Sequence, residues 1–280
     1  MQTTNNKFVK SGEISDEELL SLTTAIKNRY DIDFTNYEAR SLKRGFARLI
    51  IKQKMGSILG LWQKILNDKE FFLGCIDDLT VNLTELFRNP EIWIRMKEDV
   101  LQRFEKNIRI RMWHAGCSSG EEVYTMAMVL RDMNLLHKSR SLATDLSSTI
   151  LAQAIEGKYS KVLLSKYTQA FQKYLPNGKI SDCFEQEGRH MHVKNELKKH
   201  VEFRQHNLVQ DGMDKQFDII FCRNVMIYFD NNLKMKVLKL FHNSLAKGGV
   251  FVIGYYDMLP PEAKELFDIY DSKTRIYIKK

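Results

Sequence analysis

The sequence has little of what secreted, membrane-spanning or metal-bound proteins need. Its four cysteines, Cys75, Cys117, Cys183 and Cys222, are scattered through 280 residues without a CxxC pair. A disulfide framework or a structural zinc site is therefore not expected, and we predict no bound metal. No apolar run reaches the roughly 18 residues that a membrane span requires. The polar start, MQTTNNKFVK, lacks the apolar stretch of a signal peptide, which favours a cytoplasmic protein without membrane insertion.

Negative charge is also in short supply. The chain has 43 lysines and arginines against 35 aspartates and glutamates, which gives a formal net charge of +8 at pH 7. A basic protein attracts acidic partners, and nucleic acid, anionic lipid and an acidic protein surface all satisfy that sign. Charge alone therefore does not choose the partner. The remaining composition is that of an ordinary globular protein, without repeats or low-complexity tracts.

The first part of the chain carries helical patterns and no strand pattern. Residues 15–30 begin with a serine and a glutamate three positions apart, the spacing of a capping box, and continue with apolar residues at helical intervals. Residues 35–56 begin with a threonine and a glutamate in the same spacing, and residues 57–68 continue the helical period. We therefore predict a small all-helical N-terminal domain over residues 1–80.

The second predicted helix has an apolar face and a basic face. The apolar face consists of Leu42, Phe46, Leu49 and Ile50. The basic face consists of Arg40, Lys43, Arg44 and Arg48, again at helical spacing. A row of charges is most often a solvated helix face. Because these four cations gather on one side, they are also candidate substrate-binding residues for an acidic partner.

The pattern changes at about residue 108 to strands that alternate with amphipathic helices. Apolar strand segments occupy residues 108–116, 140–145, 217–224, 250–256 and 274–280, the last two being the final strands. Helical segments occupy residues 121–136, 147–159 and 231–249. This alternation predicts a doubly wound α/β domain over residues 108–280, reached through a linker at residues 81–107. Residues 176–204, with a hairpin turn at Glu187–Gly188, interrupt the rhythm as an inserted β-subdomain.

Ligands of open α/β sheets bind beyond the carboxyl ends of the strands. Four places meet this condition: Ala115–Glu122, Asp145, Asn207–Leu208 and Cys222–Asn224. The first loop lacks a GxGxxG or Walker pattern, and its two glutamates repel phosphate but suit a cationic or hydroxyl-bearing ligand. Asp145 ends the second strand, where it either clamps ribose hydroxyls or caps the next helix. A positively charged nucleoside such as S-adenosylmethionine fits these features.

Five segments of the sequence resemble a known family. LTVNLTELFRNP, WHAGCSSGEEVYTMAM, ATDLS, HNL and FDIIFCRNVMIYFD occur in the order typical of the CheR family of chemotaxis receptor glutamate methyltransferases. The resemblance covers nearly the whole chain. It implies a Rossmann-like methyltransferase domain with a small inserted antiparallel β-subdomain, preceded by an all-helical domain. It also implies methyl transfer from S-adenosylmethionine to glutamate side chains in the cytoplasmic domain of a methyl-accepting chemotaxis receptor, with S-adenosylhomocysteine as the product.

The resemblance also implies a set of site residues. The implied cofactor-binding residues are Asn82, Thr84, Arg88, Gly116, Glu122, Asp145, Asn207, Leu208, Cys222 and Arg223. Arg88 and Tyr228 are implied at the methyl-transfer centre, Arg88 to orient a carboxylate and Tyr228 to line the site. Three segments depart from the family pattern, one of them being the basic N-terminal helix, which differs in detail from the usual arginine-rich pattern. Residues 86–90, LFRNP, lack the second aromatic and the acid that usually flank the arginine, and residues 254–259 read GYYDML.

The chemistry of this family agrees with a further absence. The sequence has no evident Ser/His/Asp or Cys/His set, and none is needed, because a glutamate with a pKa of about 4.3 is already ionised at neutral pH. The enzyme mainly has to align the reactants and exclude water. Two alternatives remain: a protein that binds S-adenosylmethionine as a sensor or scaffold with little transfer, and an RNA methyltransferase suggested by the net charge. We expect a monomer without a nucleic-acid partner.

Overall fold

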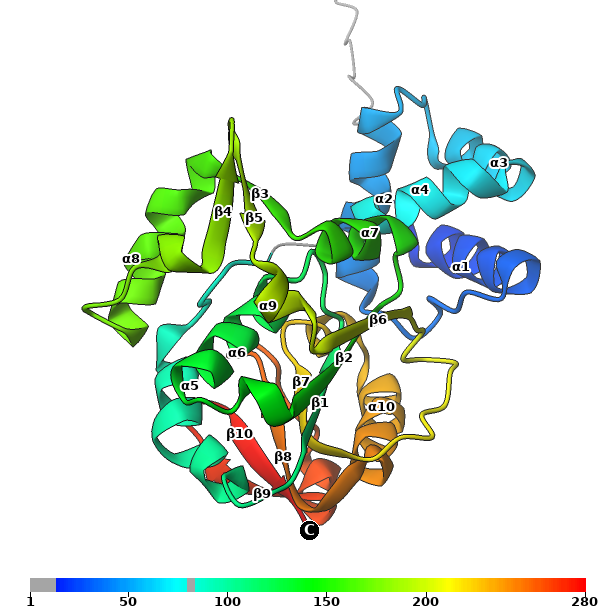
Figure 1. The fold of residues 1–280 in the computed structure, drawn as a ribbon. Coiled ribbons are helices and arrows are strands. Elements are labelled where there is room, and N and C mark those ends of the chain that lie inside the picture. Colours follow the sequence, from blue (N-terminus) through cyan, green and yellow to red (C-terminus); the bar gives the residue numbers. More distant parts are fainter. Residues whose placement is uncertain (1–13, 80–83) are drawn as a thin grey trace, which may run out of the picture. The chain divides into compact units, whose positions relative to one another are not determined.

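The chain forms two compact units, Met1–Val81 and Asn82–Lys280. The computed structural model describes residues 14–79 and 84–280 (Figure 1). Each unit has its own secondary structure and its own buried apolar side chains. The boundary falls where the sequence changes from purely helical patterns to the segment that leads into the first strand.

The first unit contains four helices within its described residues: α1 (Asp16–Tyr30), α2 (Ala39–Lys52), α3 (Ile58–Asn67) and α4 (Lys69–Leu79). The predicted all-helical N-terminal part is thus confirmed. α1 begins with the predicted capping box, because the side chains of Ser15 and Glu18 each accept from the other's backbone N–H, at 3.1 and 2.8 Å. α2 begins later than predicted. Its N-cap is Glu38, and the hydroxyl of Thr35 donates to Asp33 before the helix.

The second unit is built on a seven-stranded sheet with the order β6-β2-β1-β7-β8-β10-β9. Its strands are β1 (Ile110–Ala115), β2 (Ser139–Asp145), β6 (Val201–Gln205), β7 (Phe217–Cys222), β8 (Leu245–Ile253), β9 (Phe267–Asp271) and β10 (Ile276–Lys279). The first five pair in parallel, whereas β10 is antiparallel to both of its neighbours. The predicted Rossmann-like arrangement is therefore confirmed.

Helices cover both faces of this sheet. Figure 1 shows α5 (Pro90–Arg95) and α6 (Glu121–Asp132) on one side and α10 (Asn231–Ser244) on the other. α7 (Ser148–Glu156) contacts β2 and β6. Every residue of β7 is buried as a result. This burial agrees with its nearly continuous apolar sequence, FDIIFC, because a parallel strand covered on both faces has no solvent side.

A second, antiparallel sheet has the order β3-β5-β4, which confirms the expected small antiparallel sheet. Its strands are β3 (Lys158–Ser160), β4 (Phe184–Glu187) and β5 (His190–Val193). In the chain, α8 (Leu164–Tyr174) lies between β3 and β4, and α9 (Asn195–Lys198) follows β5. The predicted turn at Glu187–Gly188 joins β4 to β5. β3 and α8 precede the predicted range 176–204, and β6, which overlaps the end of that range, belongs to the large sheet. Aromatic side chains of α8 share one buried core with α6.

Other sequence predictions about the elements are wrong. The helix predicted to reach residue 249 ends at Ser244, and the strand predicted to begin at residue 250 begins at Leu245. The prediction omits β9, an edge strand in which Asp268 and Asp271 weaken the apolar pattern. The helix predicted to reach residue 159 ends at Glu156. It ends there because Gly157 has a φ of 59° in the left-handed region, and the residues that follow pair as β3.

Trp113 of β1 joins the sheet to α10. Its fully buried ring has its centre 5.2 Å from that of Phe241 on α10 and 5.5 Å from that of Phe217 on β7. Its indole N–H donates to the hydroxyl of Thr144 on β2 at 2.8 Å. The single polar atom of the side chain is therefore satisfied inside the core.

Replacing Thr144 with valine keeps the side-chain volume and removes the acceptor of the Trp113 N–H. We expect the free energy of unfolding to fall by about 1–3 kcal/mol, because a buried donor is left without a partner. Thr144→Ser keeps the hydroxyl acceptor and loses the methyl group, so it shows the cost of disturbed packing while the hydrogen bond remains. Chemical denaturation measures both variants. A Thr144→Val variant as stable as wild type would show that the hydrogen bond contributes nothing.

Candidate functional site

The loops that follow β1, β2 and β6 meet at one edge of the large sheet. Because these strands are parallel neighbours, their carboxyl ends lie at the same edge. The backbone N–H groups of Gly116 and Cys117 donate to the carbonyl of Thr144 at 2.8 and 2.9 Å. The N–H of His206, after β6, donates to the carbonyl of Asp145 at 3.0 Å. These hydrogen bonds fix the three loops relative to one another.

Gly116 follows β1 in a conformation that favours glycine. Its φ is +81°, and a β-carbon at this position would clash with Cγ2 of Val225, in the loop after β7. Any larger side chain would therefore strain both the backbone and the neighbouring loop. The loop after β1 presents bare backbone at this point, and two loops of the sheet edge approach each other closely.

Asp145 ends β2 with its carboxylate held by two backbone N–H groups. Oδ2 accepts from Ser118 at 2.9 Å, and Oδ1 accepts from Ser147 at 3.1 Å. The N-cap of α7 is Ser147, whose hydroxyl accepts from the N–H of Ile150 at 3.1 Å. Asp145 is therefore not the cap of this helix, which removes one of its two sequence-based alternatives. Its partly exposed carboxylate stands oriented at the sheet edge.

Both acids at the start of α6 contact protein side chains. Glu121 is buried and accepts from the hydroxyl of Ser119 at 2.7 Å, and burial raises its pKa above the ordinary value. Glu122 accepts from Nη1 of Arg223 at 3.2 Å and lies 3.0 Å from Nδ1 of His114. Burial disfavours the Glu122 carboxylate, but His114 and Arg223 together hold its pKa below the ordinary value.

The Arg223 guanidinium connects three segments of the second unit. In addition to Glu122 on α6, it contacts the turn before α5, where Nη2 donates to the carbonyl of Arg88 and to Oδ1 of Asn89, each at 3.0 Å. It also lies over the ring of Trp93 in α5, 5.2 Å from the ring centre. The side chain is only 2% exposed. These contacts therefore form where the effective dielectric constant is low and each is stronger than at the surface.

Arg88 lies between two residues with unusual backbone conformations. Phe87 and Asn89 have φ values of 54° and 57°, in a region that costs residues other than glycine about 1–2 kcal/mol each. The Phe87 N–H donates to the hydroxyl of Thr125 at 3.0 Å, and the Trp93 indole N–H donates to the carbonyl of Arg88 at 3.1 Å. Together with the guanidinium contacts described above, these bonds hold the turn and present Arg88 at a defined position.

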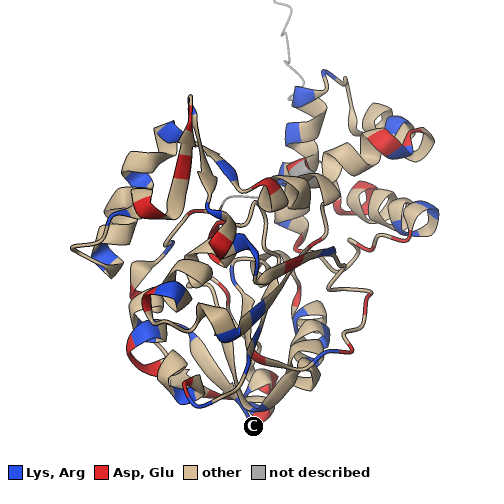
Figure 2. Cartoon of the chain, in the orientation of Figure 1, with Lys and Arg blue, Asp and Glu red and all other residues tan. Residues whose placement is uncertain are grey.

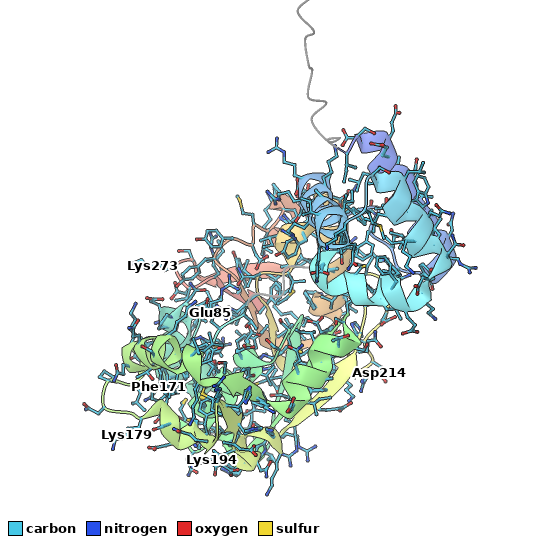
Figure 3. All side chains as sticks on the ribbon, turned by 90° about the horizontal axis from the view of Figure 1, so that it is seen from above. Glu85, Phe171, Lys179, Lys194, Asp214 and Lys273 are labelled. Atoms are coloured by element: carbon cyan, nitrogen blue, oxygen red, sulfur yellow. The ribbon has the colours of Figure 1, made fainter. Side chains whose placement is uncertain are left out.

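The segment before Arg88 is anchored to α8. Glu85 forms an ion pair with Lys166 at 2.6 Å, and the Phe87 ring meets the Phe171 ring edge to face, with centres 5.0 Å apart. Figure 3 shows Glu85 beside α8, the helix on which Phe171 lies. The segment that carries Arg88 therefore packs against the inserted part of the second unit as well as against α6.

A buried carboxylate holds the loop after β7. Oδ2 of Asp257 accepts from the backbone N–H groups of Asn224 at 2.6 Å and Gly254 at 2.8 Å. Asn224 has a φ of 61°, and the chain continues into the short 3-10 helix Met226–Tyr228, whose Tyr228 is partly exposed. Asp257 lies in the departing segment GYYDML. This segment, which differs from the family pattern, therefore supplies the carboxylate that accepts the hydrogen bonds of the loop carrying Tyr228.

Comparison with known proteins identifies the family. The family description "CheR methyltransferase, SAM binding domain" matches residues 82–276, and "CheR methyltransferase, all-alpha domain" matches residues 17–80. The chain belongs to the CheR methyltransferase family. S-adenosylmethionine is therefore its cofactor, and the family and the cofactor predicted from the sequence are both confirmed.

Relatives of this CheR methyltransferase match it over most of their length. The chemotaxis protein methyltransferase of Borreliella burgdorferi is 32% identical over 287 residues, covering 92% of this chain and 94% of the relative. That of Listeria innocua is 31% identical, covering 85% of this chain and 89% of the relative. A solved SAM-dependent methyltransferase from Geobacter sulfurreducens in complex with S-adenosyl-L-homocysteine is similar at 17% identity and a TM-score of 0.35, over 64% of this chain and 53% of that one.

The residues at the sheet edge fit this cofactor chemically. The oriented carboxylate of Asp145 suits ribose hydroxyls, and Gly116 lets the loops after β1 and β7 approach each other closely at the same edge. Cys222 is fully buried at the end of β7, and burial raises the pKa of its thiol well above the ordinary value. It is therefore a neutral packing group rather than a nucleophile. Asn207 uses its side chain locally, since Oδ1 accepts from Val209 at 3.0 Å.

The other predicted site residues lie in several places. Thr84 and Leu208 are partly exposed in the second unit, and Asn82 lies outside the described residues. The four cations of the basic face all lie on α2 of the first unit. Lys43 pairs with Asp16 at 3.0 Å, and the other three, Arg40, Arg44 and Arg48, are exposed.

Four residues that contact the site were missed by sequence reasoning: Asn89, Trp93, His114 and Asp257. His114 carried a usable signal, because a fully buried histidine in an otherwise apolar strand needs a partner. The other three carried none, because their roles depend on contacts with Arg223 or with the loop after β7. Across the described part of the chain, no helix is long and apolar enough to cross a membrane, and no cluster of three His, Cys, Asp or Glu side chains is arranged to hold a metal ion.

Gly116→Ala tests the close approach of the loops after β1 and β7. The added methyl group strains the left-handed backbone and meets Val225. Overpacking of this kind costs about 1–3 kcal/mol, so we expect affinity for S-adenosylhomocysteine to fall roughly tenfold by isothermal titration calorimetry. Adding Val225→Ala should restore part of the loss. Gly212→Ala is the control, because a β-carbon there meets nothing within 4 Å; equal affinities for the two alanine variants would contradict the prediction.

Glu122→Gln tests the buried ion pair. The variant leaves the Arg223 guanidinium without its carboxylate, so we expect the free energy of unfolding at neutral pH to fall by about 3–5 kcal/mol. Because the pKa of Glu122 is lower in the folded than in the unfolded chain, its stabilisation is complete above the ordinary pKa of about 4.3 and is lost as the pH falls through the folded value. The difference in stability between wild type and variant should therefore shrink below about pH 4.

Denaturant unfolding at several pH values between about 3 and 7 measures this difference. Glu185→Gln, which removes an exposed carboxylate on β4, is the matched control. We expect it to change the free energy of unfolding little at any of these pH values. A Glu122→Gln deficit that stays constant down to acid pH would mean that the ion pair is not the source of the stabilisation.

Proposed function

We propose that this protein transfers the methyl group of S-adenosylmethionine to glutamate side chains in the cytoplasmic domain of chemotaxis receptors. The products are glutamate methyl esters and S-adenosylhomocysteine. The observation that carries the proposal is the position of the turn that contains Arg88. The buried Arg223, at the carboxyl end of β7, holds this turn by hydrogen bonds to the carbonyl of Arg88 and to Asn89. The names of the two relatives, both chemotaxis protein methyltransferases, support a chemoreceptor as the methyl acceptor.

The acceptor needs alignment rather than activation. A glutamate side chain has an ordinary pKa of about 4.3, so it is an anion at neutral pH and needs no general base. When bound, S-adenosylmethionine supplies a methyl group carried on a positively charged sulfur. A carboxylate oxygen forms the new bond to the methyl carbon, the electron pair of the broken bond stays on sulfur, and no proton is released. The task of the protein is to bind, orient and exclude water.

Arg88 and Tyr228 are the residues we assign to the acceptor. A guanidinium donates two parallel hydrogen bonds to one carboxylate, which fixes its plane in a way that an ammonium group does not. Arg88 orients the glutamate without removing its charge. Tyr228, on the loop that Asp257 holds, supplies a hydroxyl and an aromatic wall beside the methyl group.

The remaining site residues serve the cofactor. Asp145 takes the ribose hydroxyls, and Gly116 lets the loops after β1 and β7 approach each other closely at the same edge. Glu122 and Arg223 act on the cofactor site largely by joining α6, the end of β7 and the turn of Arg88. The other residues that we assign to cofactor binding are Asn82, Thr84, Asn207, Leu208 and Cys222.

The basic face of α2 is our candidate surface for the receptor. Arg40, Arg44 and Arg48 are exposed on this helix, whereas Lys43 is partly neutralised by Asp16. An acidic surface on the receptor would gain charge complementarity here, which acts mainly on the rate of encounter and on specificity. Binding through this face is therefore expected to weaken as salt is added.

The direct test is methylation of purified receptor cytoplasmic fragments with radiolabelled S-adenosylmethionine. We expect label on the fragment, and we expect alkali to release it as methanol, because glutamate methyl esters are base-labile. Replacing the modified glutamates with alanine should abolish labelling. Calorimetric binding of S-adenosylmethionine without labelling of any receptor fragment would instead favour a sensor or scaffold.

Arg88→Lys tests the orienting role in the same assay. The variant keeps the positive charge and loses the paired donors, so we expect turnover to fall roughly tenfold or more. Arg103→Lys, an exposed site on the same unit, is the control and should keep wild-type turnover. If Arg88→Lys methylates receptor fragments at the control rate, Arg88 does not orient the acceptor.

A further inference from the structure

A basic cleft lies at the amino ends of the parallel strands, the sheet edge opposite the cofactor site. Its volume is about 520 Å³, within the range of roughly 300–1,000 Å³ that is usual for small-molecule sites. The charged side chains that line it include Arg109, Arg111, Arg140, Lys199, Glu202 and Lys215. Figure 2 shows Lys and Arg segments where β2 begins. The cleft is therefore a second, separate concave site, with five cations and one carboxylate among these residues.

Positive groups of this cleft face one another across adjacent strands. Arg111 of β1 is the direct neighbour of Arg140 of β2 in the parallel register. Nη1 of Arg140 in turn lies 3.3 Å from Nδ1 of His200, just before β6. Like charges at opposed positions of neighbouring strands repel each other. Burial and, after it, the charge of Arg140 lower the pKa of His200.

Carboxylates compensate only part of this charge. Arg111 contacts Asp218 of β7 at 3.6 Å, and Lys215 contacts Glu202 of β6 at 3.1 Å. Among residues 14–79 and 84–280, no carboxylate lies within ion-pair distance of the three remaining cations of the cleft, Arg109, Arg140 and Lys199. These three come from different segments, before β1, at the start of β2 and before β6. The arrangement therefore favours an anion that enters from solvent.

We propose that this cleft binds a small phosphorylated ligand that carries two or more phosphate groups. The guanidinium groups of Arg109 and Arg140 and the ammonium group of Lys199 come from three different segments. Together they can donate to more oxygen atoms than a single phosphate group offers, so a ligand with several phosphates suits them better. The cleft is also lined by Leu142, Val201 and Phe217, which supply apolar surface for an organic part of the ligand. Because the cations gather inside one cleft, a compact ligand suits them better than an extended strand of nucleic acid.

Isothermal titration calorimetry of the full chain tests this proposal with inorganic tripolyphosphate and with GTP. Saturating S-adenosylhomocysteine is present throughout, so that the nucleotide cannot occupy the cofactor site. We expect both probes to bind, and we expect added salt to weaken both, because the contacts are charge pairs. Tighter binding of GTP than of tripolyphosphate would support a contribution from the apolar lining, and equal binding would support recognition of the phosphates alone.

The double variant Arg140→Gln/Lys199→Gln removes two of the three uncompensated cations. We expect affinity for tripolyphosphate to fall roughly tenfold or more, because charge-assisted hydrogen bonds are lost. The matched control is Lys236→Gln/Lys239→Gln, which removes the same charge from exposed positions on α10. It should bind like wild type. Unchanged S-adenosylhomocysteine affinity in both double variants shows that the fold and the cofactor site are intact.

Three results would overturn the proposal. The first is the absence of binding heat with both probes, and the second is equal tripolyphosphate affinity in the two double variants. The third is tight binding of a single-stranded RNA that depends on Arg140 and Lys199 and that tripolyphosphate does not displace. That result would assign the cleft to nucleic acid and not to a small phosphorylated ligand.

Discussion

The buried ion pair between Arg223 and Glu122 is the contact on which the site depends. A guanidinium removed from water requires several compensating partners, since its desolvation costs several kcal/mol. This chain supplies the Glu122 carboxylate, the carbonyl of Arg88, the Asn89 amide oxygen and the Trp93 ring. Each partner belongs to an element that the site needs in place. Satisfying one buried charge therefore fixes α6, the end of β7 and the turn before α5 together.

Backbone strain gathers at the same edge of the sheet. Phe87, Asn89 and Asn224 all have positive φ values, and each lies in a segment that borders the site. Such conformations persist only where the surroundings over-determine them. Here the surroundings are specific: Thr125, Arg223 and Asp257 bind the strained segments through hydrogen bonds. The strained φ values therefore allow these turns to place their backbone and side chains where a turn of ordinary conformation would not place them.

The two edges of the large sheet differ in charge for a topological reason. In a parallel sheet, the residues before every strand lie at one edge and those after every strand lie at the other. Basic segments lie just before or at the first residues of β1, β2 and β6: IRIR, KSRS and KKH, respectively. Their cations therefore collect at the edge of the sheet where the parallel strands begin. GEE, which follows β1, brings acids to the carboxyl edge. Part of the net charge of +8 is thereby concentrated in one cleft, away from the cofactor site.

The sequence by itself determined the helical first unit, the alternation of strands and helices in the second, and the strand ends at which Gly116, Asp145 and Arg223 would lie. These features depend on apolar periodicity and on turn residues, which act between neighbours along the chain. Only the tertiary structure decided that Ser147 and not Asp145 caps α7, that β9 forms an edge strand, and that His114, Trp93 and Asp257 support the site. Ser147 caps its helix through a local hydrogen bond, while the carboxylate of Asp145 also accepts from Ser118 on another loop. The other outcomes depend on contacts between residues far apart in sequence, such as Asn89 and Arg223, which a parallel sheet brings together only once it has folded.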